Sequence, residues 1–148
     1  MESTVTIRLA QSDDDVLRCF PVMAELRPHL DRDEFLPRVT RMREQNGFWM
    51  AFVEEGGEVR AVAGYRYLDL LFSGLTLYVD DLVTDPRHRS SGHGRALLRW
   101  LQDQARSKGC ATLTLDSGVQ RIDAHRFYFR ERMHIHGYHF TLALDPPA

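Results

Sequence analysis

Cysteine is scarce in this sequence, with Cys19 and Cys110 the only two among 148 residues. Metal-binding and redox motifs place cysteines close together, and these two residues have no such spacing. We therefore expect two reduced, partly buried thiols, and no structural disulfide.

Long apolar stretches are also absent. A helix that spans a bilayer needs about 20 consecutive apolar residues, and no stretch of this sequence approaches that length. The first residues, MESTVTIRLAQ, do not have the architecture of a signal peptide. These absences predict a cytoplasmic protein without a membrane partner.

A strong excess of one charge is lacking as well. The formal net charge is −2, which argues against a general nucleic-acid surface. Hydrophobic residues make up 43% and charged residues 27%, which is ordinary for a globular protein. The length of 148 residues is close to the commonest size of one domain. We expect a single domain over residues 1–148.

The most informative stretch covers residues 78–108, YVDDLVTDPRHRSSGHGRALLRWLQDQARSK. Its pattern predicts a strand, a turn that contains Gly92 and Gly94, and an amphipathic helix that ends before Gly109. The two glycines let the backbone approach a ligand, and the first amides of a helix favour phosphate. Positive charge surrounds the turn, at Arg87, His88, Arg89 and Arg95. The turn is therefore a candidate phosphate site.

Two familiar phosphate motifs do not fit these residues. A P-loop has Lys and then Ser or Thr after its last glycine, whereas Gly94 is followed by Arg95 and Ala96. A Rossmann turn needs a third glycine and a downstream acid. A tight strand-to-helix connection without a ligand is the plain structural alternative for the two glycines.

Strand and helix signals alternate along the whole chain. Strands are predicted over residues 4–9, 48–54, 59–70, 75–84, 111–115 and 135–144, and helices over residues 12–26, 31–45, 92–108 and 122–132. Pro21 is expected to kink or restart the first helix. The order βααβββαβαβ predicts an α/β (α+β) fold with a mixed, mostly antiparallel twisted sheet flanked by helices. Residues 75–84 and 111–115 should form a parallel pair, because a helix connects them.

The glycine turn resembles motif A of the GNAT superfamily of acyl-CoA-dependent N-acyltransferases. That motif reads Arg or Gln, two residues, Gly, any residue, then Gly or Ala, and Arg89, Gly92 and Gly94 match it in register. Residues 124–128, AHRFY, resemble a second family pattern, A-x-x-F-Y. The expected element order is also similar to the GNAT fold. The family usually has two strands after its last helix, and this chain has room for one good strand.

The resemblance implies acetyl-CoA as the co-substrate, inserted like an extra strand where the parallel strands splay apart. It places the pantetheine arm against the amides of Leu82, Val83 and Thr84. It places the phosphates at the turn formed by Arg89, Ser90, Ser91, Gly92, His93, Gly94 and Arg95. Arg121 stands where the family often has an Asn that contacts the pantetheine arm. It could bind a phosphate or an anionic group of the substrate instead.

The second pattern implies a catalytic acid. Tyr128 matches the tyrosine that protonates the departing thiolate in the family. A phenol with a pKa of about 10 stays protonated at neutral pH. A buried core tyrosine is the alternative explanation of this position.

The general base is open between several residues, and we name Asp81 and Asp116 as the candidates. Asp80 and Asp81 are adjacent on one expected strand, so they should lie on opposite faces, and at most one should point into the acceptor cleft. Asp116 and Ser117 end the next strand. His125 could order a water, although a surface histidine is the commoner explanation.

A metal site is not expected. His134 and His136 alternate along the last expected strand and share one face. A structural or catalytic metal site needs further ligands, and no cysteine or acid partner is evident near them.

Together these residues predict an N-acetyltransferase that transfers an acetyl group from acetyl-CoA directly to a primary amine. A small-molecule acceptor is the expectation, with a peptide N-terminus or a protein lysine as alternatives. A non-catalytic acyl-CoA-binding or sensor module is the competing hypothesis, and nucleotide binding by a Rossmann-like turn is disfavoured. The oligomeric state is left open, with a homodimer among the alternatives.

Overall fold

A computed structural model describes residues 4–89 and 91–145 of the chain. The chain divides into two compact units, Met1–Leu115 and Asp116–Ala148. The first unit contains the sheet together with α1, α2 and α3, and the second contains α4.

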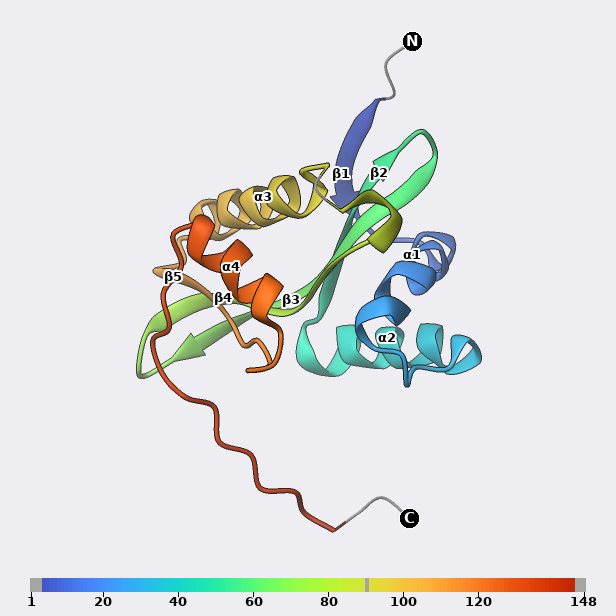
Figure 1. The fold of residues 1–148 in the computed structure, drawn as a ribbon. Helices are drawn as coiled ribbons and strands as arrows, with labels where there is room; N and C mark the ends of the chain where they lie inside the picture. Colours follow the sequence, from blue (N-terminus) through green and yellow to red (C-terminus); the bar gives the residue numbers. More distant parts are fainter. Residues whose placement is uncertain (1–3, 90, 146–148) are drawn as a thin grey trace. The chain divides into compact units, whose positions relative to one another are not determined.

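The first unit is built on one five-stranded sheet in the order β1-β2-β3-β4-β5. The strands are β1 Val5–Leu9, β2 Trp49–Glu55, β3 Glu58–Leu70, β4 Gly74–Thr84 and β5 Thr112–Leu115. Neighbours from β1 to β4 are antiparallel, whereas β4 and β5 are parallel. The predicted mixed sheet with one parallel pair is therefore confirmed (Figure 1).

The helices of the first unit begin and end at capping residues. Helix α1, Asp13–Leu26, starts where the Ser12 side chain accepts a hydrogen bond from the Asp15 amide, and it runs through Pro21 without restarting. Helix α2, Arg32–Asn46, starts at Asp31 and ends at Gly47, which has a φ of 65°. The short 3-10 helix η1, Pro86–His88, leads from β4 toward α3, His93–Ser107. Within the described ranges, no helix is long and apolar enough to cross a membrane.

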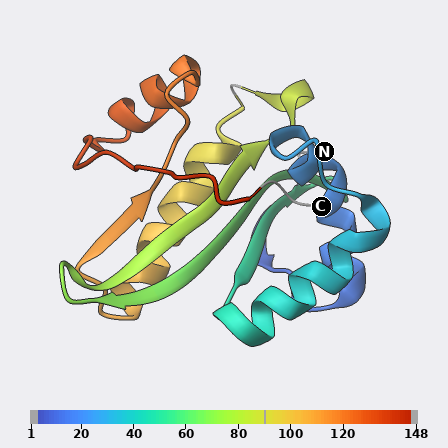
Figure 2. The ribbon, with the colours of Figure 1, turned by 90° about the horizontal axis from the view of Figure 1, so that it is seen from below.

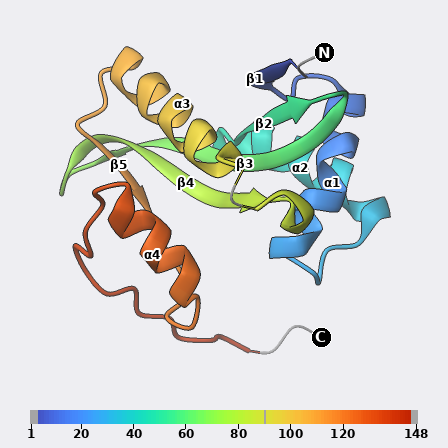
Figure 3. The same cartoon turned by 45° about the horizontal axis from the view of Figure 1, so that its top comes forward.

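The sheet has an apolar core on each face, because alternate residues of a strand point to opposite sides. Met50 and Phe52 of β2 pack with α1 and α2 on one face. Ala51 and Val53 of the same strand pack with α3 on the other face. Figure 3 shows the sheet between α3 and the α1–α2 pair. The first unit is thus a three-layer arrangement of α3, the sheet and the α1–α2 pair.

A β-bulge interrupts the pairing of β3 with β4, which form the long hairpin seen in Figure 2. Gly64 pairs with Asp81 and Tyr65 pairs with Val79, so Asp80 is the extra residue. A bulge of this kind bends the strand and redirects side chains. Because of the bulge, Asp80 and Asp81 do not alternate between the two faces of the sheet as residues of a regular strand would.

The second unit contains α4, Ile122–Arg130. Its C-terminal end is closed by hydrogen bonds from the Met133 amide to the Tyr128 carbonyl and from the Arg132 amide to the Phe129 carbonyl, both of 3.0 Å. This pattern is a Schellman motif, which favours glycine at the position that Arg132 occupies. Arg132 takes the required left-handed conformation, with a φ of 66°.

The strand predicted over residues 135–144 is wrong. The structure assigns neither helix nor strand to residues 133–144, and Figure 1 draws them as an extended trace. The apolar alternation that suggested the strand is present, but Tyr138, Phe140, Leu142 and Leu144 are 81–91% exposed. A strand requires a neighbouring strand for its backbone hydrogen bonds, and within the described residues of one chain this segment has none.

Candidate functional site

The turn before α3 has the geometry expected of an anion site. Gly92 is the N-cap residue with a φ of 83°, and no side chain caps the helix. A β-carbon at Gly92 would meet nothing within 4 Å, so the glycine is explained by its backbone conformation and not by crowding. Ser91 and Gly92 are exposed. The α3 N-terminus thus lies beside an exposed surface, and among the described residues the N-cap position provides no side-chain hydrogen bond.

The basic residues next to this turn differ in their exposure and in whether an acid pairs with them. Arg87 is 74% exposed in its side chain and pairs with Asp85, with 2.9 Å between Nη2 and Oδ2. The Arg87 hydrogen bond holds the pKa of Asp85 below its usual value. Arg89 and Arg95 are also exposed. Ser90, which the sequence assigned to the phosphate site, lies outside the described residues.

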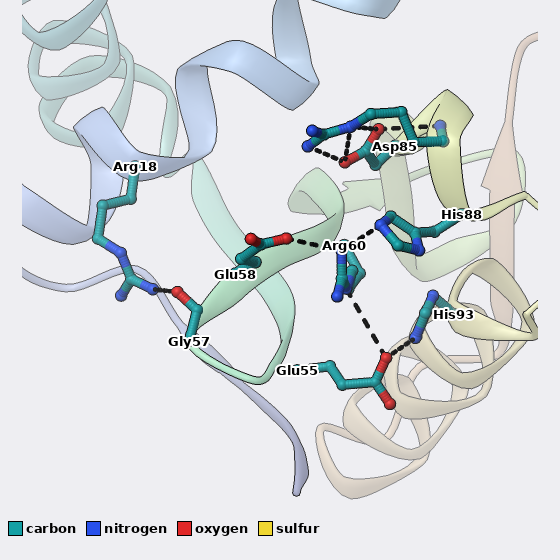
Figure 4. A network of polar contacts seen from close by, with 9 residues as sticks. Arg18, Glu55, Gly57, Glu58, Arg60, Asp85, His88 and His93 are labelled. Carbon is teal, nitrogen blue, oxygen red and sulfur yellow. Dashed lines mark hydrogen bonds and ion pairs between the residues drawn. The ribbon is translucent and has the colours of Figure 1, made fainter. Parts of the chain in front are cut away.

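His93 lies beneath the turn and not at its surface. Its side chain is 6% exposed, and its Nε2 is 3.4 Å from Oε1 of Glu55 at the end of β2. The Nδ1 atom of His93 is buried without a hydrogen-bond partner among the described residues. Arg60 of β3 lies between Glu55, Glu58 and the His88 ring, as Figure 4 shows. These contacts connect the β2–β3 hairpin to both sides of the glycine turn.

The edge of β4 that faces β5 is open beyond the parallel pairing. That pairing covers Thr76 to Val79 of β4 and stops where Leu115 ends β5. On its other edge, β4 pairs with β3 through Leu82, Val83 and Thr84. The backbone groups that these residues direct away from β3 have no strand beside them in the described part of the chain. An extended ligand that contains amides could bond such an edge.

Asp80 and Asp81 lie on one face of β4, and the expectation of opposite faces is wrong because of the bulge. Arg27, which follows α1, places Nε 2.9 Å from Oδ1 of Asp81 and donates from Nη2 to the Asp80 carbonyl at 3.1 Å. Arg66 of β3 places Nε 3.0 Å from Oδ1 of Asp80. Burial raises the pKa of both carboxyls, and the two arginines partly offset it. The result is a pair of shielded acids with two fixed countercharges.

Gly64 leaves room for this acid pair. A β-carbon at Gly64 would lie 2.5 Å from Cζ of Phe48 and 2.8 Å from Oδ2 of Asp81. Contacts of that length do not occur between packed atoms, so any larger residue would displace the carboxylate or the ring. Glycine at this position therefore leaves the Asp81 carboxylate the space that it occupies.

The remaining candidate residues belong to the second unit. Tyr128 of α4 is half-buried, and burial raises the pKa of its hydroxyl, opposed by the Arg121 guanidinium. Asp116 lies with Oδ2 3.6 Å from Nδ1 of His139. His125 contacts the Gly118 carbonyl through Nε2 at 2.8 Å, which gives its ring a structural partner within the unit.

Metal ligands are not grouped in the described ranges, where no set of three His, Cys, Asp or Glu side chains could hold an ion. The His134 and His136 rings are neighbours, with centroids 5.8 Å apart.

Sequence analysis did not identify the partners of the acids or of His93. One signal was available, because His93, Leu97, Leu101 and Ala105 recur at intervals of four and are all buried along α3. Arg27 and Arg66 carried no comparable signal. They are separated by 54 and 14 residues from the acids that they pair with, and a sequence pattern cannot indicate such distant pairs.

Comparison with known proteins identifies the family. Residues 10–134 match the acetyltransferase (GNAT) family. The chain is 35% identical over 117 residues to the uncharacterized N-acetyltransferase YhdJ of Bacillus subtilis, covering 79% of this chain and 82% of the relative. It is 38% identical over 66 residues to an aminoalkylphosphonate N-acetyltransferase of Salmonella typhimurium, covering 45% of this chain and 43% of that protein.

Solved structures share the fold at lower identity. An aminoglycoside N-acetyltransferase in complex with CoA superimposes with a TM-score of 0.85 at 14% identity, covering 97% of each chain. This likeness concerns the fold alone. The family match over most of the chain and the 35% identity to YhdJ are the stronger findings, and they show that this chain belongs to the acetyltransferase (GNAT) family of acyltransferases.

Proposed function

We propose that this protein is an N-acetyltransferase that uses acetyl-CoA and acts on a primary amine of a small molecule. One observation carries the proposal: β4 continues to Thr84 after its parallel pairing with β5 has stopped at Val79, and the chain then turns into α3 at the uncapped, left-handed Gly92. An open strand edge that is followed by an anion-binding helix start suits a ligand with an amide-bearing arm and a pyrophosphate.

The residues present fit that cofactor. The pantetheine arm would bond the free edge of β4 at Leu82, Val83 and Thr84, and the phosphates would lie at Ser91 to Arg95. Exposed Arg89 would add charge to the phosphates. Support comes from membership of the family and from a structure of similar fold that contains CoA. The family match also crosses the boundary between the two units, which supports one catalytic domain over residues 1–148.

The proposed reaction is a direct transfer. The amine nitrogen attacks the thioester carbonyl, the C–N bond forms, and the C–S bond breaks. The attacking amine loses one proton to a base, and the departing thiolate takes one proton from an acid, so the products are the amide and the CoA thiol. Tyr128 is the proposed acid. Its raised pKa keeps the hydroxyl protonated over the neutral range.

Asp81 is the proposed base, acting directly or through a water, with Asp116 as the alternative. Burial raises the pKa of Asp81 and so strengthens it as a base, while Arg27 holds the carboxylate in place. The neighbouring Asp80 is already paired with Arg66. A positively charged amine that approaches this face would meet two carboxylates before it is deprotonated.

The acceptor class is inferred from a relative. The matched Salmonella protein is named for an aminoalkylphosphonate, which carries an amine and a phosphorus-containing anion. Arg27 lies beside the Asp80–Asp81 pair, and its side chain is 43% exposed, so it could contact such an anion while the acids contact the amine. We propose small amines that carry an anionic group as the first acceptors to test.

The test is an amine panel with thiol release as the readout, including 2-aminoethylphosphonate and neutral amines of similar size. Release that depends on acetyl-CoA and on an amine supports the proposal. Tight binding of acetyl-CoA without release on any amine would instead identify a non-catalytic acyl-CoA module.

Gly92→Val tests the cofactor site directly. Lost backbone hydrogen bonds to a charged group should weaken acetyl-CoA binding by about 10–100-fold. Gly109→Val is the matched control, because Gly109 has a φ of 81° at the other end of α3. The Gly109→Val variant therefore bears the same kind of backbone strain, but away from the turn at Gly92. Equal affinity in calorimetry for the folded Gly92→Val variant and the wild type would show that the phosphates bind elsewhere.

A further inference from the structure

The turn of the β2–β3 hairpin has a conformation that its own sequence favours. Glu55 and Glu58 pair at the end of the two strands, and the two residues between them, Gly56 and Gly57, have φ values of 60° and 77°. Two successive positive φ values are typical of a type I′ turn, which matches the twist of the paired strands. Arg18 of α1 holds this turn through a hydrogen bond of 3.1 Å from Nη2 to the Gly57 carbonyl. The Glu55 carboxylate therefore extends from a backbone that is held in place.

Packing alone does not explain His93. It is the first residue of a buried row on α3 that continues with Leu97, Leu101 and Ala105, and a leucine would continue that row without burying a polar atom. The imidazole is only 5% exposed. It buries Nδ1 without a hydrogen-bond partner among the described residues, which costs free energy. The feature that a leucine could not provide is the contact of Nε2 with Oε1 of Glu55, at 3.4 Å.

Arg60 forms a second connection between the hairpin and the turn. Its carbonyl accepts a hydrogen bond of 2.8 Å from the Asp85 amide, and its guanidinium contacts the His88 ring. Its Nε lies 3.7 Å from Oε1 of Glu55, which is the same oxygen that faces His93 (Figure 4). One carboxylate oxygen therefore connects the segment that enters the turn with the helix that follows it.

The residues between these two connections are exposed where the structure describes them, at Arg89, Ser91 and Gly92. No side chain caps the helix at Gly92. A helix N-terminus binds an anion through several backbone amides at once, so these amides must point toward one place. A turn that is already held in that conformation loses less conformational freedom when the ligand binds. Contacts beneath the turn can therefore raise the affinity for a ligand that they do not touch.

We infer that Glu55 is a positioning residue, which accepts contacts from His93 and Arg60 and so holds the glycine turn in the conformation that receives the phosphates of acetyl-CoA. The inference rests on the proposed function, which places the phosphates at this turn. The negative charge of Glu55 makes the sign of its effect informative. A carboxylate near bound phosphates repels them, so charge alone predicts tighter binding when Glu55 is removed. Positioning predicts weaker binding.

Calorimetry with acetyl-CoA and the full chain compares Glu55→Ala with Glu55→Gln. Both variants remove the charge, but the glutamine side chain keeps an oxygen that can accept a hydrogen bond from His93. Glu55→Ala should raise the Kd of acetyl-CoA by about 5–20-fold, because the turn is no longer held before binding. Glu55→Gln should stay within about 3-fold of the wild type. Equal or tighter binding by Glu55→Ala overturns the inference, as does a glutamine variant that binds as weakly as the alanine variant.

His93→Leu separates positioning from stability. Leucine continues the buried row and removes the buried unpartnered nitrogen, so the urea midpoint should equal or exceed that of the wild type. The contact with Glu55 is lost, so the Kd of acetyl-CoA should still rise by about 5–20-fold. The double variant Glu55→Ala/His93→Leu should bind no more weakly than the weaker single variant, because both changes remove one contact. Unchanged affinity in His93→Leu, or additive losses in the double variant, would overturn the inference.

Hydrogen exchange of the free protein supplies a measurement that needs no ligand. The Ala96 amide bonds the Gly92 carbonyl at 3.0 Å, in the first turn of α3. It should exchange faster in Glu55→Ala than in the wild type, whereas the Leu101 amide further along the helix should not. Exchange of Ala96 at the wild-type rate would overturn the inference. A wild-type chain without affinity for acetyl-CoA would refute the proposed function itself, which is a different result from variants that bind as the wild type does.

Discussion

Tyr128 combines a half-buried side chain with a hydroxyl whose pKa is raised by burial. Tyr128→Phe removes the hydroxyl and keeps the ring. If the hydroxyl protonates the thiolate, kcat should fall by about 10²–10⁴-fold while the Kd of acetyl-CoA changes little. On the alkaline side, wild-type activity should persist until the pH rises above the ordinary tyrosine pKa of 10.0, because the raised pKa delays loss of the acid.

The measurement is kcat against pH on the best acceptor, with calorimetry for the cofactor. A Phe variant that turns over at the wild-type rate would exclude Tyr128 from the mechanism. An ordered water would then be the more reasonable proton donor.

Arg132 is the non-glycine residue with a positive φ in the described chain, at 66°. A left-handed conformation costs an L-residue about 1–2 kcal/mol, and glycine avoids that cost but has a more flexible unfolded state. Arg132→Gly should therefore raise the free energy of unfolding by about 0.5–1 kcal/mol, measured by urea denaturation. Arg126→Gly is the matched control inside α4 and should lower it by about 1 kcal/mol. If Arg132→Gly lowered the free energy of unfolding instead, the Arg132 side chain would have to make a contact that stabilises the fold by more than the left-handed conformation costs.

The β3–β4 bulge is the element that positions the proposed base. Gly64→Ala would push a methyl group to 2.5 Å from Phe48 and 2.8 Å from Asp81. The necessary shift should lower the free energy of unfolding by about 1–3 kcal/mol and lower kcat through the displaced carboxylate. Gly137→Ala is the control, because a β-carbon there meets nothing within 4 Å. A Gly64→Ala variant with unchanged stability and turnover would show that the close packing at Gly64 does not determine the position of the Asp81 carboxylate.

Elements with strong local patterns could be predicted from the sequence, and elements that depend on distant partners could not. The helix α3 and the hairpin β2–β3 have clear periodicity and glycine signals, and both are confirmed. The bulge at Asp80 depends on how β3 and β4 align over ten paired positions, which no local pattern reveals. The sequence prediction therefore put Asp80 and Asp81 on opposite faces by simple alternation, whereas the bulge brings them to one face. Residues 135–144 have the apolar alternation of a strand, but the structure assigns no strand to them, because alternation alone does not supply the neighbouring strand that backbone hydrogen bonding requires.

The candidate site also combines a feature that a local sequence pattern predicts with features that depend on residues far apart in the chain. The glycine turn lies within one short stretch, and the structure gives it an exposed position and a left-handed N-cap residue, as a phosphate site requires. The surroundings of the acids come from α1, β3 and β4 together. Their electrostatics could not be derived from sequence, because the raised pKa values arise from burial in the folded unit.

These buried acids should influence the stability of the whole protein. The pKa of Asp81 is raised in the folded state, so above the unfolded value of about 3.9 the folded protein still holds a proton that the unfolded chain has released. The free energy of unfolding should therefore fall as the pH rises from about 3.9 through the raised pKa. Asp81→Asn removes the titrating group, and the decline in that window should become smaller.

Urea midpoints of the wild type and of Asp81→Asn, measured at closely spaced pH values from about 3.5 to 7, test this sign. The ion pair of Asp81 with Arg27 forms as the carboxyl ionises, so its effect is already contained in the pKa of Asp81, and the slope and not the height of the curve is diagnostic. Asp123→Asn is the control, since the Asp123 side chain is 98% exposed, and its curve should keep the wild-type slope. If Asp81→Asn kept that slope as well, Asp81 would be equally acidic in the folded and unfolded chain, and burial would not make it the stronger base that the proposed mechanism needs.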